Sequence, residues 1–165
     1  MTDYPMTTDR DQNIEPTEYT DYITFAVSDV LLGIPITNVD EINRNLDVTP
    51  VPHAPPSVVG VLNLRGDVVT IIDLARVLDL PQVESTRQSR VVIVRSYGER
   101  IGLRVDRIAD VVRVSPAALE PVPCNMNSLD IRFFRGVYRL EEQIMAVLDV
   151  EAALAAASGD ATVAS

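Results

Sequence analysis

Residues 58–78 read VVGVLNLRGDVVTIIDLARVL, and residues 134–154 read FRGVYRLEEQIMAVLDVEAAL. Each stretch has two runs rich in β-branched and apolar residues, a polar break between them, and helix-compatible residues at its end. This pattern predicts strand, turn, strand and short helix. The stretches align without a gap, and the matched pairs are Gly60–Gly136, Val61–Val137, Leu64–Leu140, Ile71–Val147, Asp73–Asp149 and Leu78–Leu154.

A second pair of related stretches precedes these two. Residues 22–42 read YITFAVSDVLLGIPITNVDEI, and residues 91–111 read VVIVRSYGERIGLRVDRIADV. Each predicts a strand, a tight turn, a second strand and a short helical turn, with the tight turns near Ser28–Asp29 and Tyr97–Gly98. The gapless matches include Gly33–Gly102, Ile36–Val105, Val39–Ile108, Glu41–Asp110 and Ile42–Val111.

The order of the four segments predicts an internal duplication. Short strands separated by frequent turns are typical of small closed or nearly closed β-barrels. One such unit of roughly 60 residues buries little surface, so two units are expected to pack against each other. The sequence therefore predicts a mainly β fold, built as a pseudo-two-fold pair of barrels with short helices.

Proline and acidic residues indicate where the strands end. The proline-rich stretch 51–56 is expected to be a loop, because proline cannot donate to a central ladder. Asp73 and Asp149 each follow an apolar run and are predicted to cap the helices after them. Ser115 followed by Pro116 predicts another short helix, with Ser115 as its N-cap.

Both ends of the chain differ in composition from the part between them. Residues 1–20 are acidic and poor in apolar residues, which predicts a disordered tail that is a solvating extension or an arm that tunes partner binding. Residues 156–165 are small and polar and are predicted to fray. The folded domain is expected to span residues 21–155.

The overall charge argues against several classes of partner. The chain has a net charge of −10, and its 14 basic residues are all arginine. Nucleic acids and anionic membrane surfaces require clustered positive charge, so neither is an expected partner. No apolar run reaches the roughly 20 residues of a membrane span, and no signal peptide is evident. The predicted location is the cytoplasm.

Reactive groups are scarce. His53 is the only histidine and lies in the proline-rich loop, and Cys124 is the only cysteine. A nucleophile with a base, or a zinc site, needs more such groups than these. Acidic pairs such as Asp40–Glu41 are adjacent, and adjacent strand residues are expected to face opposite ways. The sequence predicts neither an enzyme nor a cofactor or metal site.

One local mismatch inside the repeat is informative. The turn in residues 58–78 carries Asn63, Leu64, Arg65 and Gly66, whereas the matched turn carries Glu141 in place of Arg65. The surrounding apolar positions still match, so a cation is not needed there for folding. Arg65 is either an ordinary turn residue or part of a function specific to the first unit.

Residues 60–74 closely resemble the signature of CheW-like domains, and so does the run from Gly33 to Ile42. The resemblance covers roughly residues 19–155. It implies two intertwined five-stranded SH3-like barrels, of about residues 21–85 and 86–155. It also implies an adaptor that bridges the cytoplasmic hairpin tip of chemoreceptors to the regulatory domain of a CheA-type histidine kinase, in membrane-associated arrays that include rings with other CheW-like domains.

The resemblance also implies a receptor-binding site at a groove between the barrels. The family's functional arginine and glutamate fall on Arg65 and Glu41, and a neighbouring apolar contact falls on Val39. Asn63 and Gly66, in the same turn as Arg65, complete the predicted receptor-binding set. No kinase-binding residue is predicted. An apolar contact patch is expected from among four residues, some of which must be core: Val39, Ile42, Leu62 and Leu64.

Two departures from the family pattern leave alternatives open. Thr70 stands where the family usually has proline, and Asn43 stands where it often has a basic residue. A specialised paralogue serving a pilus-type or other non-flagellar pathway is therefore one alternative. A standalone SH3-like peptide-binding module is another, although aromatic residues, which line such peptide grooves, make up only 5% of the chain.

Overall fold

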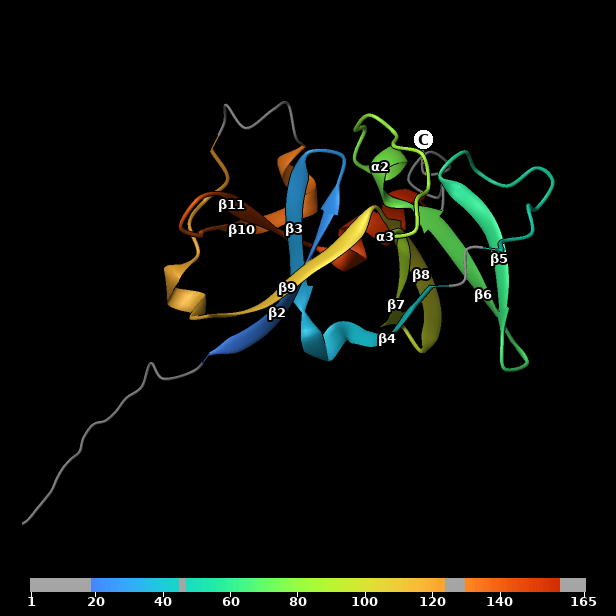
Figure 1. Ribbon diagram of the computed structural model, residues 1–165, viewed down its shortest axis with the longest axis horizontal. Coiled ribbons are helices and arrows are strands. Elements are labelled where there is room, and N and C mark those ends of the chain that lie inside the picture. The colour runs from blue at the N-terminus through green and yellow to red at the C-terminus, as the bar shows by residue number, and fades with distance from the viewer. Residues whose placement is uncertain (1–18, 45–46, 124–129, 158–165) are drawn as a thin grey trace, which may run out of the picture.

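The computed structural model describes residues 19–44, 47–123 and 130–157. Within these ranges the strands form two five-stranded sheets (Figure 1). Sheet 1 has the order β10-β11-β3-β2-β9, with β10 Phe134–Arg139, β11 Ile144–Leu148, β3 Val30–Pro35, β2 Thr20–Val27 and β9 Arg107–Val114. Sheet 2 has the order β4-β7-β8-β6-β5, with β4 Val39–Asn43, β7 Arg90–Ser96, β8 Glu99–Val105, β6 Asp67–Asp73 and β5 Val58–Leu64.

The mainly β fold with two five-stranded SH3-like units is confirmed, but each sheet is open. Among the described residues, the ladder of sheet 1 ends at β10 and β9, and that of sheet 2 ends at β4 and β5. The closed form of the predicted barrels is therefore not formed by backbone hydrogen bonds.

The two copies of the repeat exchange strands. The hairpin β2–β3 pairs with β9 from the second copy, and the hairpin β7–β8 pairs with β4 from the first. The hairpin β5–β6 joins the hairpin β7–β8 through the parallel pair of β6 with β8. The hairpin β10–β11 joins the hairpin β2–β3 through the parallel pair of β11 with β3. Both sheets thus contain segments from both halves of the chain.

Because of this exchange, each half of the chain contributes strands to both sheets. The ranges of about 21–85 and 86–155 do not separate the sheets, because β4 leaves the first hairpin and β9 leaves the second. The 3-10 helix η2, Ile36–Asn38, carries the chain from β3 across to β4. A bend at Asp106 does the same between β8 and β9.

Both tight turns lie where the sequence predicted them. Ser28–Asp29 joins β2 to β3, and Tyr97–Gly98 joins β7 to β8. The helical turn after β3 is present as η2, but the one predicted after β8 is absent. There the Asp106 N–H donates to the carbonyl of Ala26 at 2.9 Å, and its carboxylate accepts from the Ser28 N–H at 2.6 Å. These two bonds fix the chain directly against β2.

The two predicted aspartate caps are confirmed. Asp73 precedes α2, Leu74–Val77, and accepts the N–H of Ala75 at 3.1 Å. Asp149 precedes α3, Val150–Ala157, and accepts the N–H of Ala152 at 3.2 Å. Two further 3-10 helices are η3, Pro116–Ala118, and η4, Ile131–Phe133. Pro116 opens η3 as predicted, but the side chain of Ser115 makes no capping bond.

The first strand and the last helix extend slightly beyond residues 21–155. Thr20 already begins β2, and residues 1–18 and 158–165 lie outside the described residues. At the other end, α3 continues to Ala157, whose side chain is buried in the core. The proline-rich stretch 51–56 is a loop outside the strands, as predicted.

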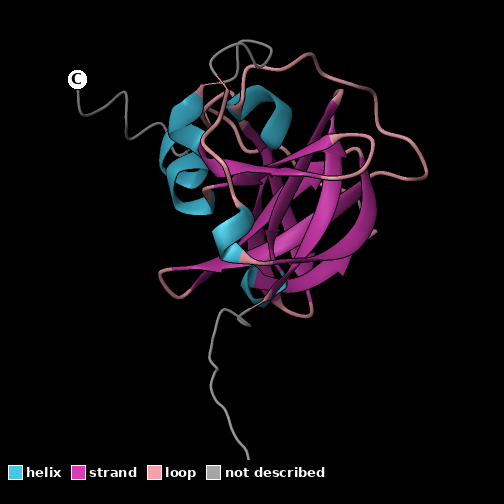
Figure 2. Ribbon diagram, turned by 90° about the vertical axis from the view of Figure 1, so that its left-hand side faces the viewer, coloured by secondary structure: helices cyan, strands magenta, loops and turns pink. Residues whose placement is uncertain are grey.

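A shared core joins the two sheets. One apolar cluster includes Phe25 and Ile34 of sheet 1 together with Val92 and Leu103 of sheet 2, all fully buried. The helices α2 and α3 add to this cluster, and Figure 2 shows helices gathered along one side of the strands. Because large aliphatic side chains fill this region from both sheets, the sheets are expected to unfold together.

Candidate functional site

Arg65 lies at the tip of the β5–β6 hairpin. Arg65 and Gly66 have φ angles of 50° and 90°, as in the two-residue turns that suit the twist of a hairpin. The Asn63 side-chain oxygen accepts the Gly66 N–H at 3.2 Å, which stabilises the turn. The Arg65 side chain is 69% exposed, so the turn presents a cation to solvent.

Glu41 lies on β4 and forms an ion pair with Arg65. Arg65 is in the turn that follows β5, and β4 and β5 are the opposite edges of sheet 2. The sheet must therefore curl so that its edges approach each other at this end. The ion pair between Arg65 and Glu41 thus spans the gap between the two edges that backbone hydrogen bonds do not join. These are two residues that the sequence predicted to lie in one site.

Glu41 has further partners that its sequence position did not reveal. The Nη2 atom of Arg100 lies 3.1 Å from Glu41 Oε1, and the Asn43 amide donates to Oε2 at 3.2 Å. The hydrogen bond from Arg65 is the largest cause of a lowered pKa at Glu41, followed by the bond from Asn43. The carboxylate is therefore held in its charged form at neutral pH.

A bulge in β4 corrects the expectation for Asp40 and Glu41. The β4–β7 register shifts between Val39 and Glu41, so the alternation of faces is interrupted. Asp40 Oδ2 lies 2.9 Å from Nε of Arg100, whose Nη2 contacts Glu41. Both neighbouring carboxylates therefore contact one guanidinium. The contact of Arg100 Nε with Asp40 is an ion pair whose angle does not meet hydrogen-bond geometry.

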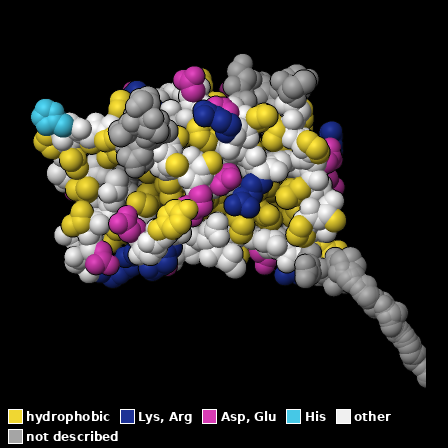
Figure 3. Space-filling view, turned by 180° about the vertical axis from the view of Figure 1, so that it is seen from behind, with side chains coloured by type: hydrophobic (Ala, Val, Ile, Leu, Met, Phe, Trp, Pro, Cys, Tyr) yellow, Lys and Arg dark blue, Asp and Glu magenta, His cyan; other side chains and the backbone are white. Residues whose placement is uncertain are grey.

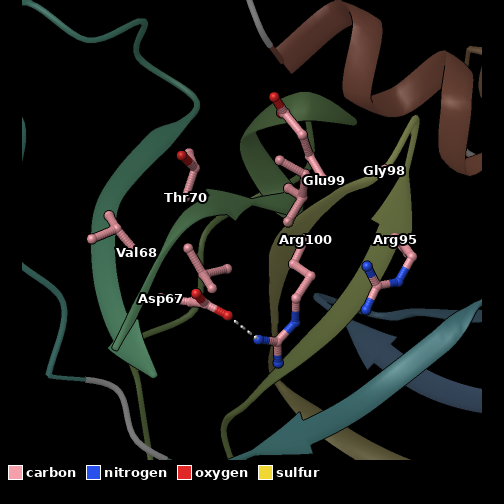
Figure 4. Close-up of a pocket in the computed structure, with 9 residues that line it drawn as sticks. Asp67, Val68, Thr70, Arg95, Gly98, Glu99 and Arg100 are labelled. Carbon is pink, nitrogen blue, oxygen red and sulfur yellow. Dashed lines mark hydrogen bonds and ion pairs between the residues drawn. The ribbon is translucent and has the colours of Figure 1, made fainter. Parts of the chain in front are cut away.

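A hollow of about 500 Å³ lies beside these ion pairs, between β6 and the β7–β8 hairpin (Figure 4). In Figure 4, Arg100 points to Asp67 at the start of β6. The Nη1 atom of Arg100 lies 3.3 Å from Asp67 Oδ2. Arg95 on β7 is the register partner of Arg100. The hollow is lined by Asp67, Val68, Val69, Thr70, Arg95, Gly98, Glu99, Arg100 and Ile101. Sequence reasoning missed Arg95, Arg100 and Asp67 as site residues.

The apolar residues predicted near the site divide between surface and core. Leu62 and Leu64 are 2% and 5% exposed, so they belong to the interior of sheet 2. Val39 is half-buried against the shared core, and Ile42 is 39% exposed. We call Val39, Glu41, Asn63, Arg65 and Gly66 the candidate contact surface. Figure 3, which shows the face opposite to Figure 1, has acidic and basic side chains side by side between apolar patches.

The remaining reactive residues lie away from this surface or outside the description. His53 is exposed in the proline-rich loop, as predicted, and Cys124 lies outside the described residues. Over the described ranges, histidine, cysteine and acidic residues form no group that could hold a metal ion. No helix in the same ranges has the length and apolar character needed to cross a membrane.

The structure is that of a two-sheet SH3-like protein with an exposed, ion-paired candidate contact surface. The chain belongs to the CheW-like domain family, whose family model matches residues 21–158. This match confirms the resemblance found in the sequence and places the chain in the chemotaxis adaptor family.

Several relatives support the assignment. The chain is 33% identical over 132 residues to the chemotaxis protein CheW of Klebsiella aerogenes, covering 79% of each chain. It is 30% identical over 130 residues to the probable chemotaxis protein CheW of Rhizobium etli, covering 79% of this chain and 84% of that one. The crystal structure of scaffolding protein TtCheW from Thermoanaerobacter tengcongensis matches with a TM-score of 0.75 at 25% identity, covering 81% and 86% of the two chains.

Proposed function

We propose that this chain is a non-enzymatic adaptor that couples the cytoplasmic hairpin tip of chemoreceptors to the regulatory domain of a CheA-type histidine kinase. Membership of the CheW-like family supports the general role. The observation that carries the site is the Arg65–Glu41 pair, which links the opposite edges of sheet 2 and leaves Arg65 largely exposed.

The pair suits recognition better than stabilisation. An ion pair with a partner as exposed as Arg65 contributes only about 0–1 kcal/mol to folding. Glu41, however, orients the planar guanidinium, whose fork can then bind a polar group on a partner. The repeat supports this view, because the matched turn carries Glu141 and still forms the same hairpin.

The other members of the contact surface have supporting roles in the proposal. Asn63 and Gly66 fix the turn that presents Arg65, and Val39 supplies apolar area next to Glu41. Transient adaptor contacts typically have affinities near micromolar, or about −8 kcal/mol, and need only a modest apolar patch. The protein would work in the cytoplasm at receptor arrays, including rings with other CheW-like domains.

One observation bears on which receptors are served. Asn43, at the position where the family often has a basic residue, donates to Glu41 rather than adding charge beside it. This favours a specialised paralogue with its own receptor class, in a pilus-type or other non-flagellar pathway.

The direct test is Arg65→Glu in the full chain, measured by pull-down with a receptor hairpin-tip fragment and with the kinase. We expect at least a tenfold loss of receptor affinity and a loss of no more than about 1 kcal/mol in unfolding free energy, because the pair with Glu41 is largely exposed. Arg113→Glu is the matched control, because Arg113 is 70% exposed and pairs with Asp21 on sheet 1. Equal receptor binding by Arg65→Glu and wild type would contradict the proposed site, and failure of wild type to bind receptor or kinase would contradict the function.

A further inference from the structure

We propose that Arg100 is a positioning residue for the candidate contact surface, an inference that rests on the function proposed above. Its side chain is 15% exposed, against 69% for Arg65. Its guanidinium lies within ion-pair distance of Glu41, Asp67 and Asp40, at 3.1, 3.3 and 2.9 Å. The guanidinium of Arg100, on β8, thus links two strands that lie in opposite directions from β8 within sheet 2, β4 and β6.

Arg100 restrains Arg65 from two directions. Both arginines contact the same oxygen of Glu41, so Arg100 helps to set where that oxygen stands. Arg100 also pairs with Asp67, two positions after Arg65 and at the start of β6. Arg65 is therefore restrained through its carboxylate partner Glu41 and through Asp67, at the start of the strand that follows its turn. Asn43, on the second oxygen of Glu41, completes the restraint.

The matched positions in sheet 1 indicate that this network is not a requirement of the fold. The residues matched to Arg100, Asp40 and Asp67 are Leu31, Ala109 and Gln143. Leu31 is 7% exposed and packs in the apolar interior of sheet 1. Sheet 1 therefore folds with an aliphatic residue where sheet 2 has a cation bound to three carboxylates. Sheet 2 thus has both Arg100 and Arg65, whereas sheet 1 has Leu31 and Glu141 at the matched positions.

A useful variant has to keep the fold while removing the restraint. Removing Arg100 alone would leave three carboxylates close together without their shared cation, which is destabilising. The double change Asp40→Ala with Arg100→Leu instead copies Ala109 and Leu31 of sheet 1. Asp40→Ala alone is the matched control, because it leaves Arg100 on both Glu41 and Asp67.

The test is a double-mutant cycle on affinity for a purified receptor hairpin-tip fragment, with the unfolding midpoint measured for each protein. We expect Arg100→Leu/Asp40→Ala to lose about tenfold in affinity and Asp40→Ala alone less than twofold. Arg65→Ala should lose a similar amount, and combining it with the double change should add nothing further. Arg100→Lys should also lose severalfold, because lysine keeps the charge but lacks the fork.

The outcomes separate this inference from the proposed function. If wild type does not bind the tip, or Arg65→Ala binds as wild type does, the proposed function or its site fails. If Arg65→Ala weakens binding but the double change does not, Arg100 has no positioning role. Additive losses would also overturn the inference, because a merely structural effect of Arg100 would act whether or not Arg65 is present. Should the double variant not fold, the Arg100→Lys cycle decides in the same way.

Discussion

Gly102 on β8 is the register partner of Ile71 on β6, and a Cβ atom at Gly102 would lie 2.5 Å from the Cδ1 atom of Ile71. The same relationship recurs in sheet 1, where Gly33 on β3 is the register partner of Val147 on β11. The parallel junction of each sheet thus depends on a glycine at matched repeat positions. These glycines leave room for the large aliphatic side chains of the interior.

Gly102→Ala should destabilise the protein by about 1–3 kcal/mol, because the added methyl group overpacks a filled interior. Its nearest neighbours, Ile71 and Val91, are fully buried, and Val91 has a short β-branched side chain that cannot swing away. Urea unfolding measures the change through the transition midpoint.

Gly33→Ala is the matched control for this steric effect. There the added Cβ would meet Sδ of Met145, in a flexible side chain that can move. The loss should be smaller than at Gly102, and Val91→Ala should partly rescue Gly102→Ala. Equal losses at the two glycines, with no rescue, would show that the cost lies in the backbone and not in packing.

Asp73→Ala should cost more stability than Asp149→Ala, although both residues cap a helix. Asp73 is 8% exposed and also accepts from Arg104 at 2.9 Å and from Gln82. Asp149 is 30% exposed, and its nearest arginine, Arg135, is 3.8 Å away. We expect about 1 kcal/mol for loss of the cap at Asp149 and about 2–4 kcal/mol at Asp73, where a largely buried pair is also broken.

Asp73→Asn separates the two contributions. Asparagine can still accept the Ala75 N–H but carries no charge for Arg104. The loss of unfolding free energy of Asp73→Asn should therefore fall between the losses of Asp73→Ala and Asp149→Ala. A loss as small as that of Asp149→Ala would mean that Arg104 contributes nothing to the difference.

The local features of the fold could be predicted because they depend on nearby residues. The turn at Tyr97–Gly98 and the caps at Asp73 and Asp149 follow from residue types at fixed spacing. The exchange of β4 and β9 could not be predicted in this way. The strands that could receive them, β2 and β7, are matched copies with similar apolar patterns, so the pattern alone does not choose between them.

The candidate site was predictable only in part, for the same reason. Arg65 was evident because its repeat partner is Glu141. Arg100 could have been found by extending that comparison, since the residue matched to it in the repeat is Leu31. The ion pairs of Arg100 with Asp40 and Asp67 could not have been predicted, because they join residues far apart in sequence and depend on the bulge in β4.

Glu41→Gln should destabilise the protein at neutral pH and have no effect in strong acid. The pKa of Glu41 is lowered in the folded state, chiefly by the hydrogen bond from Arg65. A lowered folded pKa gives stability that is present above the unfolded pKa, ordinarily 4.5, and is lost as the pH falls through the folded pKa. The check is the difference in unfolding free energy between wild type and variant across that range.

Glu142→Gln provides the control for that experiment, because Glu142 is exposed in the β10–β11 turn. It makes the same chemical change without removing a partner of Arg65, so the difference from wild type should stay small at every pH. A Glu41→Gln difference that persists unchanged into strong acid would show that the pair with Arg65 is not its source.

Asp106→Asn should have the opposite pH dependence. Burial raises the pKa of Asp106 above its ordinary value of 3.8, the bond from the Ser28 N–H opposes this, and the charge of Asp73 adds to it. A carboxyl whose folded pKa is raised costs stability once it ionises, so wild type loses stability as the pH rises from the unfolded to the folded pKa. The variant should therefore be the more stable protein at pH 7, and the advantage should vanish below about pH 3.8.

The gain from Asp106→Asn must be distinguished from a general effect of charge, because the chain carries a net charge of −10. Asp29→Asn removes one negative charge from the exposed turn beside Ser28 and serves as the control. Asparagine at position 106 can still accept the Ser28 N–H, so the bend between β8 and β9 should persist. If both variants gain equally at pH 7, the effect is relief of overall repulsion. If only Asp106→Asn gains, burial of that carboxylate is the cause.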